Sequence, residues 1–421
     1  MLAALKNSMK IPDLRKKILY TVALLAVYRI GSHVPVPGVD AVGLAAALGV
    51  GEGNIFGFLN LFTGGALARF TVFAQGVSPY ITASIVLNLL TTVIPKLEEL
   101  SKEPDGRKVI AQYTRYATVV LAVIQAFGTT MMARNWGVTS DSSFFGLALI
   151  TLTLTAGTMF TVWLGDKISE KGIGNGISLL IFVNIVASMP LGFINAVKAV
   201  GEGGVSVLGL LLYALISIVV IAAVVMITQG ERRIPVQYAK RVVGRKMYGG
   251  QSTHLPLKVN QSGVIPVIFA SSVLTFPLTL AQFVPALAAI NKWFEPGKFA
   301  YNLVYVLLIL FFTYFYTAVS FNPVEISTNM KKNGGYIPGL RPGKPTADYL
   351  DRTLSRITLP GAIFLAVIAV LPFLVAAVTR IPREILFFGG TGLLIVVGVA
   401  LDTMQQIEAH LLMRHYEGFL K

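Results

Sequence analysis

Hydrophobic residues in this chain gather into long unbroken runs, whereas a soluble domain spaces them at helical or alternating intervals. A helix needs about 20 mainly apolar residues to cross a hydrocarbon core about 30 Å thick, and ten runs approach or exceed that length. The pattern therefore predicts an all-α polytopic membrane protein with ten spans. The predicted spans cover residues 18–36, 76–95, 110–133, 144–165, 174–196, 205–229, 262–287, 300–322, 357–379 and 385–402.

The stretch between the first two spans breaks this pattern. The apolar run Asn54 to Thr63 is only ten residues long, which reaches about half of the hydrocarbon core at 1.5 Å per residue. Gly64 and Gly65 interrupt it, Arg69 follows, and the second span starts at Gly76. Non-helical backbone at membrane depth is tolerated only where protein or a water-filled cavity surrounds it. The sequence therefore predicts a re-entrant half-helix beside an internal cavity.

Composition agrees with the membrane assignment and excludes several chemistries. Of 421 residues, 54% are hydrophobic and 13% charged, and the mean hydropathy is +0.70. With no cysteine, the chain has no disulfide, thiolate metal site or cysteine nucleophile. Its histidines are too scattered in sequence to predict a metal site. We expect neither a cofactor nor a bound metal.

Basic residues set the predicted orientation. With the N-terminus inside, 27 of the 35 Lys and Arg fall in inner segments. Because inner loops of membrane proteins carry an excess of Lys and Arg, both termini are predicted to be cytoplasmic. Five spans precede residue 200 and five follow it, so residues 1–200 and 201–421 form two candidate halves. An odd number of spans in each half predicts an inverted, pseudo-symmetric relation between them.

The predicted spans contain no Asp or Glu, although Asp166 and Asp402 stand at span ends. Ion-coupled transporters usually keep ionisable groups at mid-membrane, so coupled transport is disfavoured. No nucleophile with a nearby histidine and acid appears in the spans either, and we expect no enzyme. Polar side chains within spans most often form hydrogen bonds between helices, although a wall that opens and reseals could use the same weak bonds. These side chains are Ser78, Ser84, Asn88, Gln125, Asn184, Ser271 and Ser272.

Two inner loops, residues 230–260 and 323–356, are longer and more basic than connectors need to be. They could be topology determinants that also attract anionic lipids. Alternatively, their aromatic, Pro and Gly content could shape a surface for a soluble partner. The sequence pattern leaves both interpretations open.

Five motifs lie in register along nearly the whole chain. They are Gly76 to Ile85, Gly172 to Ser178, Gln251 to Asn260 with Gly263 to Pro266, Pro338 to Gly343, and Gly392 to Val397. The second, Gly172-Ile-Gly-Asn-Gly-Ile-Ser178, could be taken for a phosphate loop, but it lacks the Lys-Ser/Thr ending and follows no strand, so we expect it to be a glycine-bearing entry into the fifth span. Together the five motifs resemble the SecY family of protein-conducting channels.

The resemblance implies a channel in two halves that opens across the membrane and sideways into lipid. Branched apolar side chains would close its waist by excluding water. The implied pore ring is Ile81, Ile85, Ile181, Ile185, Ile268 and Ile395. The implied plug, at about residues 54–69, includes Asn54, Phe56, Phe58, Leu61, Phe62, Gly64, Gly65 and Arg69. We assign Ser84, Asn88, Gln125, Ser271 and Ser272 to the lateral gate.

The resemblance also implies partners and a location. The expected partners are the small membrane subunits SecE and SecG, the SecA ATPase, the ribosome and preproteins with signal peptides, in a bacterial plasma membrane. Arg341 is the residue we expect to matter most for docking. The other expected docking residues are Arg232, Arg233, Lys240, Arg241, Arg245 and Lys246. A small-solute transporter with inverted repeats and a scaffold without a pore remain the competing hypotheses.

Overall fold

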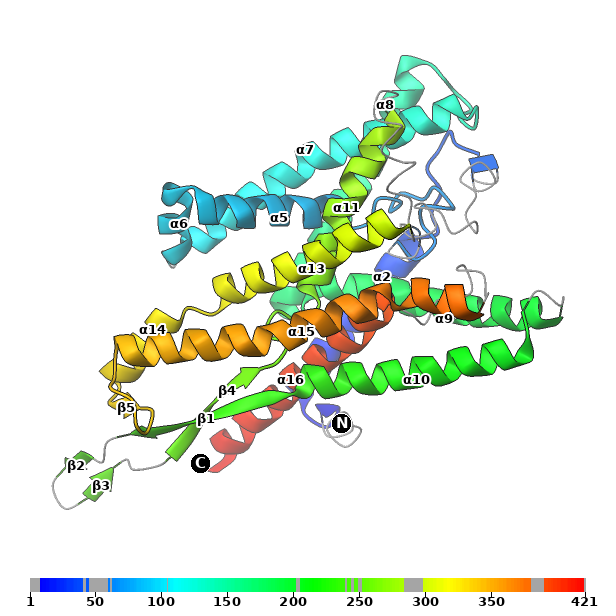
Figure 1. Ribbon diagram of the computed structural model, residues 1–421. Helices are drawn as coiled ribbons and strands as arrows, with labels where there is room; N and C mark the ends of the chain where they lie inside the picture. The colour runs from blue at the N-terminus through cyan, green and yellow to red at the C-terminus, as the bar shows by residue number, and fades with distance from the viewer. Residues whose placement is uncertain are drawn as a thin grey trace.

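The computed structural model describes residues 8–40, 43–44, 60, 63–103, 105–201, 205–238, 241–243, 246–248, 252–283, 298–379 and 390–419 (Figure 1). The chain folds as a bundle of long helices, and each predicted span coincides with one of them. These helices are α2 (Pro12–Gly31), α5 (Ser78–Val93), α7 (Gly106–Asn135), α8 (Phe144–Lys171), α9 (Gly176–Gly201), α10 (Val207–Gln229), α11 (Ile265–Phe283), α13 (Phe299–Ser320), α15 (Lys344–Thr379) and α16 (Gly390–Phe419).

Length and hydropathy support most of these spans independently. Within the described part of the chain, seven helices are long and apolar enough to cross a membrane. An eighth span results if α5 is joined to α6 (Pro95–Lys102), which bends away from it by 102°. The first helix, α2, carries Arg15, Lys16 and Lys17 within its first two turns, and the apolar part of α11 is short. The structure is therefore consistent with ten spans, of which up to eight meet the criterion of helix length and hydropathy.

Two helices extend far beyond their predicted spans. Helix α15 begins at Lys344 instead of residue 357, and α16 continues to Phe419 instead of ending at 402. A hydropathy pattern detects only the apolar part of a helix, whereas the helix continues wherever its backbone hydrogen bonds continue. The polar first turns of α15 therefore project beyond the predicted span.

Helices from both candidate halves meet in the centre of the bundle. Helix α8 packs against α2, α7 and α9, and α5 packs against α7. In the second half, α15 packs against α10, α13 and α16. The contacts α5 with α11 and α9 with α16 join the two sets. The inverted relation between residues 1–200 and 201–421 stays a prediction.

The loops also contain strands, which the all-α prediction missed. Strand β1 (Glu231–Tyr238) pairs antiparallel with β4 (Ser252–Lys258), and its end pairs with β5 (Gly335–Tyr336). Strands β2 (Arg241–Val243) and β3 (Lys246–Tyr248) form a second antiparallel pair. Along β1 the burial alternates, with Ile234 and Val236 buried between exposed neighbours, as expected for a strand with one covered face. The alternation of apolar and polar residues with a period of two was the signal for a strand that the all-α prediction overlooked.

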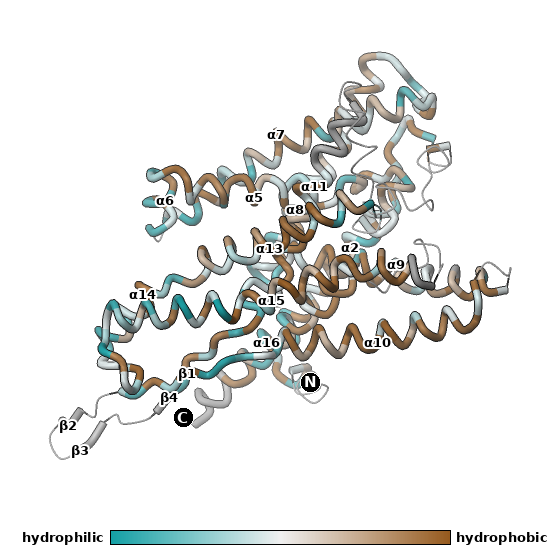
Figure 2. The backbone as a smooth tube through the Cα atoms, viewed as in Figure 1, coloured by the Kyte–Doolittle hydropathy of each residue, from teal (hydrophilic) through white to brown (hydrophobic). Residues whose placement is uncertain are grey.

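A small hydrophobic core joins the two long basic loops. Helix α14 (Pro323–Lys332), capped by the Asn322 side chain, packs with the first turns of α15 and with β5. This loop core consists of Ile234, Val236, Leu257, Phe321, Met330, Ile337, Leu350 and Leu354. In Figure 1 the strands, α14 and α6 all lie at the left end of the bundle. Figure 2 shows that this end is more hydrophilic than the brown middle of the helices.

Candidate pore and its seal

The six isoleucines of the predicted pore ring belong to one hydrophobic cluster in the middle of the bundle. Five are buried, at 7% exposed or less, and Ile81 packs against them while partly exposed. They come from α5, α9, α11 and α16, which are far apart in sequence. The buried members of the ring are Ile85, Ile181, Ile185, Ile268 and Ile395.

Local sequence explains how α9 brings its two isoleucines into this cluster. Ile181 and Ile185 are four residues apart, so they occupy one helix face. A Cβ on Gly176 would lie 1.9 Å from the Gly165 carbonyl oxygen, so glycine lets α9 begin against the backbone of α8. Gly174, with a φ of +87°, turns the chain just before it. The motif from Gly172 to Ser178 is therefore the entry into α9, as predicted.

Asn184 occupies the same stretch of α9, between the two isoleucines. Its Nδ2 donates a hydrogen bond of 2.7 Å to the Tyr28 hydroxyl of α2, and both residues are buried. A polar group removed from water is costly unless it is hydrogen-bonded, so this bond ties α2 to α9 beside the cluster.

The end of the predicted plug lies directly against Asn184. Gly64 and Gly65 have φ values of +62° and +84°, a backbone that glycine adopts without strain. A Cβ on Gly64 would lie 2.7 Å from Asn184 Oδ1 and 3.1 Å from Asn184 Cα. The other predicted plug residues Asn54, Phe56, Phe58, Leu61 and Phe62 lie outside the described residues.

Two arginines hold Gly64 in this position. Arg69 Nη2 donates to the Gly64 carbonyl oxygen at 3.1 Å, and Arg29 Nη1 donates to the same oxygen at 3.4 Å. Arg69 Nε also donates to the Gly65 carbonyl oxygen at 3.1 Å. The Gly64 carbonyl oxygen therefore brings two like charges together next to Asn184.

The segment from residue 63 to residue 77 is largely buried without being helical. The half-helix predicted at 54–64 lies almost entirely outside the described residues, so it stays a prediction. Gln75, which the sequence analysis did not single out, bridges two helices. Its Nε2 donates to the Ala122 carbonyl oxygen at 3.5 Å, and its Oε1 accepts from Thr158 Oγ1 at 2.9 Å. Thr161 Oγ1 donates to the Gly76 carbonyl oxygen at 3.2 Å. Helices α7 and α8 thus satisfy backbone and side-chain groups that a lipid environment would leave unpaired.

The predicted lateral-gate residues lie on α5, α7 and α11. Asn88 Nδ2 donates to Ser84 Oγ on α5 at 3.5 Å, and Ser271 Oγ donates to the Ile268 carbonyl oxygen on α11 at 2.8 Å. These bonds stay within one helix, although α5 and α11 pack together. Ser272 on α11 and Gln125 on α7 are partly buried. Separating α5 from α11 would leave these particular bonds intact.

Three of the predicted docking residues, Arg341, Arg232 and Arg233, lie on or next to the strands that contribute to the loop core. Arg341 is exposed in the turn between β5 and α15, where its carbonyl oxygen accepts a 2.8 Å hydrogen bond from Thr346 Oγ1. Arg232 and Arg233 are exposed on β1, and Arg233 pairs with Glu231 at 2.7 Å. Arg241 and Lys246 belong to β2 and β3, whereas Lys240 and Arg245 lie outside the described residues.

This arrangement of apolar spans, a central hydrophobic cluster and a buried non-helical segment is that of a polytopic membrane channel. A SecY family model matches residues 71–404. The protein translocase subunit SecY of Streptomyces scabiei is 46% identical, with complete coverage of both chains. The chain belongs to the SecY family, and it is a channel subunit of a protein translocase and not an enzyme.

Solved structures support the same fold. One described as a protein conducting channel matches with a TM-score of 0.67 and 18% identity, covering 94% of this chain and 92% of that one. Sec61 in the canine ribosome-channel complex matches with a TM-score of 0.62 and 16% identity, over the same fractions of the two chains. At these identities the likeness concerns the fold alone.

Proposed function

We propose that the chain is a passive, gated conduit in which the six isoleucines close the waist and residues 54–69 seal it. The observation that carries this proposal is that four helices bring these side chains into one hydrophobic cluster, with Gly64 packed beside it. Branched apolar side chains can exclude water by dewetting and yet yield to an extended peptide of any sequence. A passive conduit supplies no energy for transport, so a partner would drive the polypeptide through it.

We propose that membrane proteins pass sideways from the channel into lipid between α5 and α11. These helices pack together, while the hydrogen bonds of Ser84, Asn88 and Ser271 described above stay within each helix. Polar bonds between membrane helices are worth only about 0.6 kcal/mol on average, so an interface dominated by packing can open reversibly.

We place the protein in a bacterial plasma membrane with both termini and the loop core in the cytoplasm. The excess of Lys and Arg in the inner segments supports this orientation. Exposed Arg341, Arg232 and Arg233 would receive the SecA ATPase or the ribosome, whose RNA attracts cations. SecE and SecG would cover part of the apolar outer surface.

Reconstitution tests this function. The chain with SecE and SecG in vesicles, given SecA, ATP and an unfolded secretory polypeptide, should render the polypeptide resistant to external protease. Vesicles without SecA provide the control. Specific uptake of a small solute driven by an ion gradient, with no protected polypeptide, would refute the proposal in favour of a secondary transporter.

A further inference from the structure

The exposed face of α15 changes its chemistry along the helix. Asp351, Arg352, Ser355 and Arg356 are exposed in the turns before residue 357. The same face continues with apolar side chains at intervals of four residues. These are Leu359, Ile363 and Val367, which are 47%, 49% and 51% exposed.

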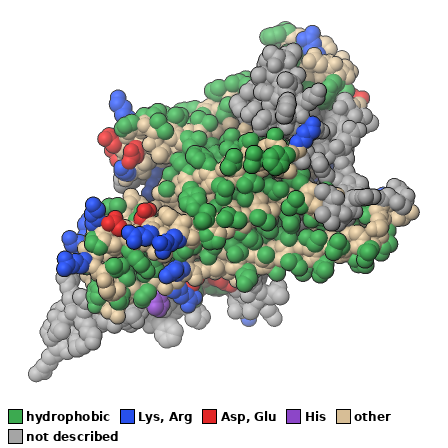
Figure 3. Space-filling model, viewed as in Figure 1, with side chains coloured by type: hydrophobic (Ala, Val, Ile, Leu, Met, Phe, Trp, Pro, Cys, Tyr) green, Lys and Arg blue, Asp and Glu red, His purple; other side chains and the backbone are tan. Residues whose placement is uncertain are grey.

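This change of chemistry marks where the helix enters the membrane. Exposed apolar side chains at this spacing suit lipid, and arginines just outside them can extend to the headgroup level. In Figure 3 basic side chains gather beside acidic ones at the left, and a continuous hydrophobic surface starts directly next to them. The entry point lies between Arg356 and Leu359.

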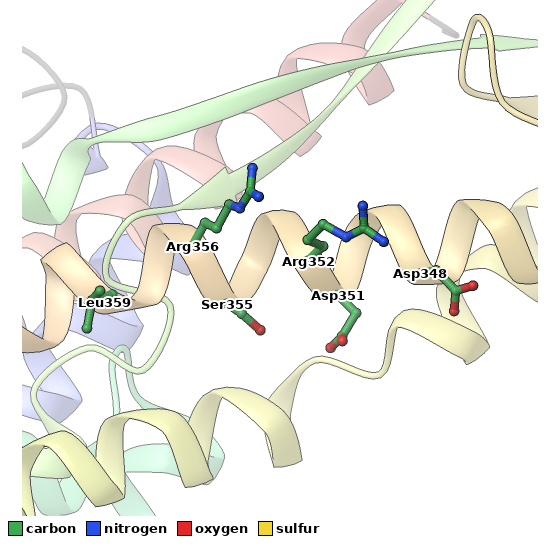
Figure 4. Close-up of a pocket in the computed structure, with 6 residues that line it drawn as sticks. All are labelled: Asp348, Asp351, Arg352, Ser355, Arg356 and Leu359. Atoms are coloured by element: carbon green, nitrogen blue, oxygen red, sulfur yellow. The ribbon is translucent and has the colours of Figure 1, made fainter.

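A surface pocket of about 550 Å³ lies at this entry point. In Figure 4 the side chains of Arg352 and Arg356 extend toward the green strands. Those of Asp351 and Ser355 extend to the opposite side, where yellow α13 and α14 run. The pocket is lined by Asp348, Asp351, Arg352, Ser355, Arg356 and Leu359. All six residues come from α15, so their positions along this one helix define the order of the charges.

The charged groups of the pocket are separated from one another. Asp348 and Arg352 are four residues apart, a spacing at which a helix often forms an ion pair. Among the ion pairs found in the described part of the chain, none involves either arginine or either aspartate of the pocket. Two cations and two anions are therefore left exposed without an ion pair along α15, with the arginine side chains extending to one side of the helix and the Asp351 side chain to the other.

We propose that this pocket binds the headgroup of an ethanolamine phospholipid. Moving outward from Leu359 along α15, the two arginines come first and the two aspartates second. In such a lipid the phosphate lies next to the acyl-bearing glycerol, and the ammonium follows two carbons further out. Arg352 and Arg356 would hold the phosphate, since guanidinium groups match phosphate geometry. Asp348 and Asp351 would accept hydrogen bonds from the ammonium.

The charge order distinguishes this ligand from other phosphates. A lipid with only negative charge would leave both aspartates unpaired and close to its own charge. A choline lipid carries the positive charge but has no N–H to donate to the carboxylates. A phosphate of RNA would lack the acyl chains that fit Leu359 and Ile363. The match therefore requires an apolar tail, a phosphate and a protonated amine in that order.

Retention of lipid by the full-length chain tests the proposal. Native mass spectrometry would compare phosphatidylethanolamine, phosphatidylcholine and phosphatidylglycerol on the original chain and on two double variants. Arg352→Gln with Arg356→Gln should weaken retention of phosphatidylethanolamine about tenfold, because charged hydrogen bonds are lost. Asp348→Asn with Asp351→Asn should abolish its preference over phosphatidylglycerol.

The control is Lys331→Gln with Lys332→Gln, an equal loss of charge on neighbouring α14 outside the pocket. It should retain phosphatidylethanolamine as the original chain does, and thermal melting should show that every variant is folded. Equal retention by the arginine variant and this control would overturn the proposal. The proposal would also be overturned if the original chain retained phosphatidylglycerol as well as phosphatidylethanolamine and the aspartate variant did not change this ratio.

Discussion

Gly64 meets two separate requirements at one position. Its φ of +62° is costly for residues with a Cβ, and the space where that Cβ would lie is occupied by Arg29 Nη1 and Asn184 Oδ1. Asn184 in turn lies between Ile181 and Ile185. A change at Gly64 therefore acts on the helix that supplies two members of the proposed pore ring.

Gly64→Ala should increase the resting ion leak of vesicles that contain the channel, because the added methyl group must displace Asn184 or Arg29. Gly137→Ala is the matched control, since Gly137 has a φ of +68° and no atom within 4 Å of its virtual Cβ. Both variants carry the backbone cost of about 1–2 kcal/mol, but only the first has the collision. Equal leak from the two variants would contradict the role of this contact.

Ile185→Asn should also raise the resting leak several-fold, because an amide at a dewetted waist favours water. Ile150→Asn provides the control, since Ile150 is equally buried in a different hydrophobic cluster. Conductance of single channels in planar bilayers would measure the difference. A comparable leak from both variants would mean that loss of packing, and not the pore, is responsible.

At the scale of elements, the loop core determines how the basic loops are presented. Strand β1 contributes Ile234 and Val236 to it, and α15 contributes Leu350 and Leu354. The same α15 continues into the central cluster through Leu365 and Ala369. One helix thus connects the docking surface with the interior of the bundle.

Leu354→Ala should release β1 and β4 from α15, since removing a buried leucine side chain costs about 2–5 kcal/mol. Hydrogen exchange in residues 231–238 and 252–258 should become faster, while exchange in α8 stays unchanged. Leu359→Ala, at an exposed position of the same helix, is the control. Unchanged exchange in both strands would show that the loop core does not hold them.

In the whole molecule, we assign closure of the pore and docking of the driving partner to two different regions. The proposed seal combines the central cluster with Gly64, whereas the proposed docking surface is the loop core with Arg341. Because these regions have separate hydrophobic cores, a surface substitution in one should leave the other intact.

Arg341→Glu should reduce SecA-driven protection of a secretory polypeptide at least tenfold, about 1.4 kcal/mol, without changing the resting leak. Lys344→Glu makes the same charge change at an exposed neighbouring position and should have a smaller effect. Both measurements use the same vesicles. An altered leak with normal translocation would reverse the proposed assignment of the two regions.

The sequence by itself determined the class of the molecule and the location of its helices. Uninterrupted apolar runs avoid water only when they are buried in lipid or protein. Hydropathy therefore predicted the spans, the break at Gly64 and the absence of Asp and Glu from the interior of the spans. The tertiary structure alone decided that Gln75 bridges α7 and α8, that Asn184 bonds Tyr28 beside Gly64, and that β1 and α15 share one hydrophobic core. These contacts join residues far apart in the chain, and their geometry depends on helix packing that no local pattern encodes. The charge order on α15 became visible for the same reason, because only the folded chain shows that the helix begins at Lys344.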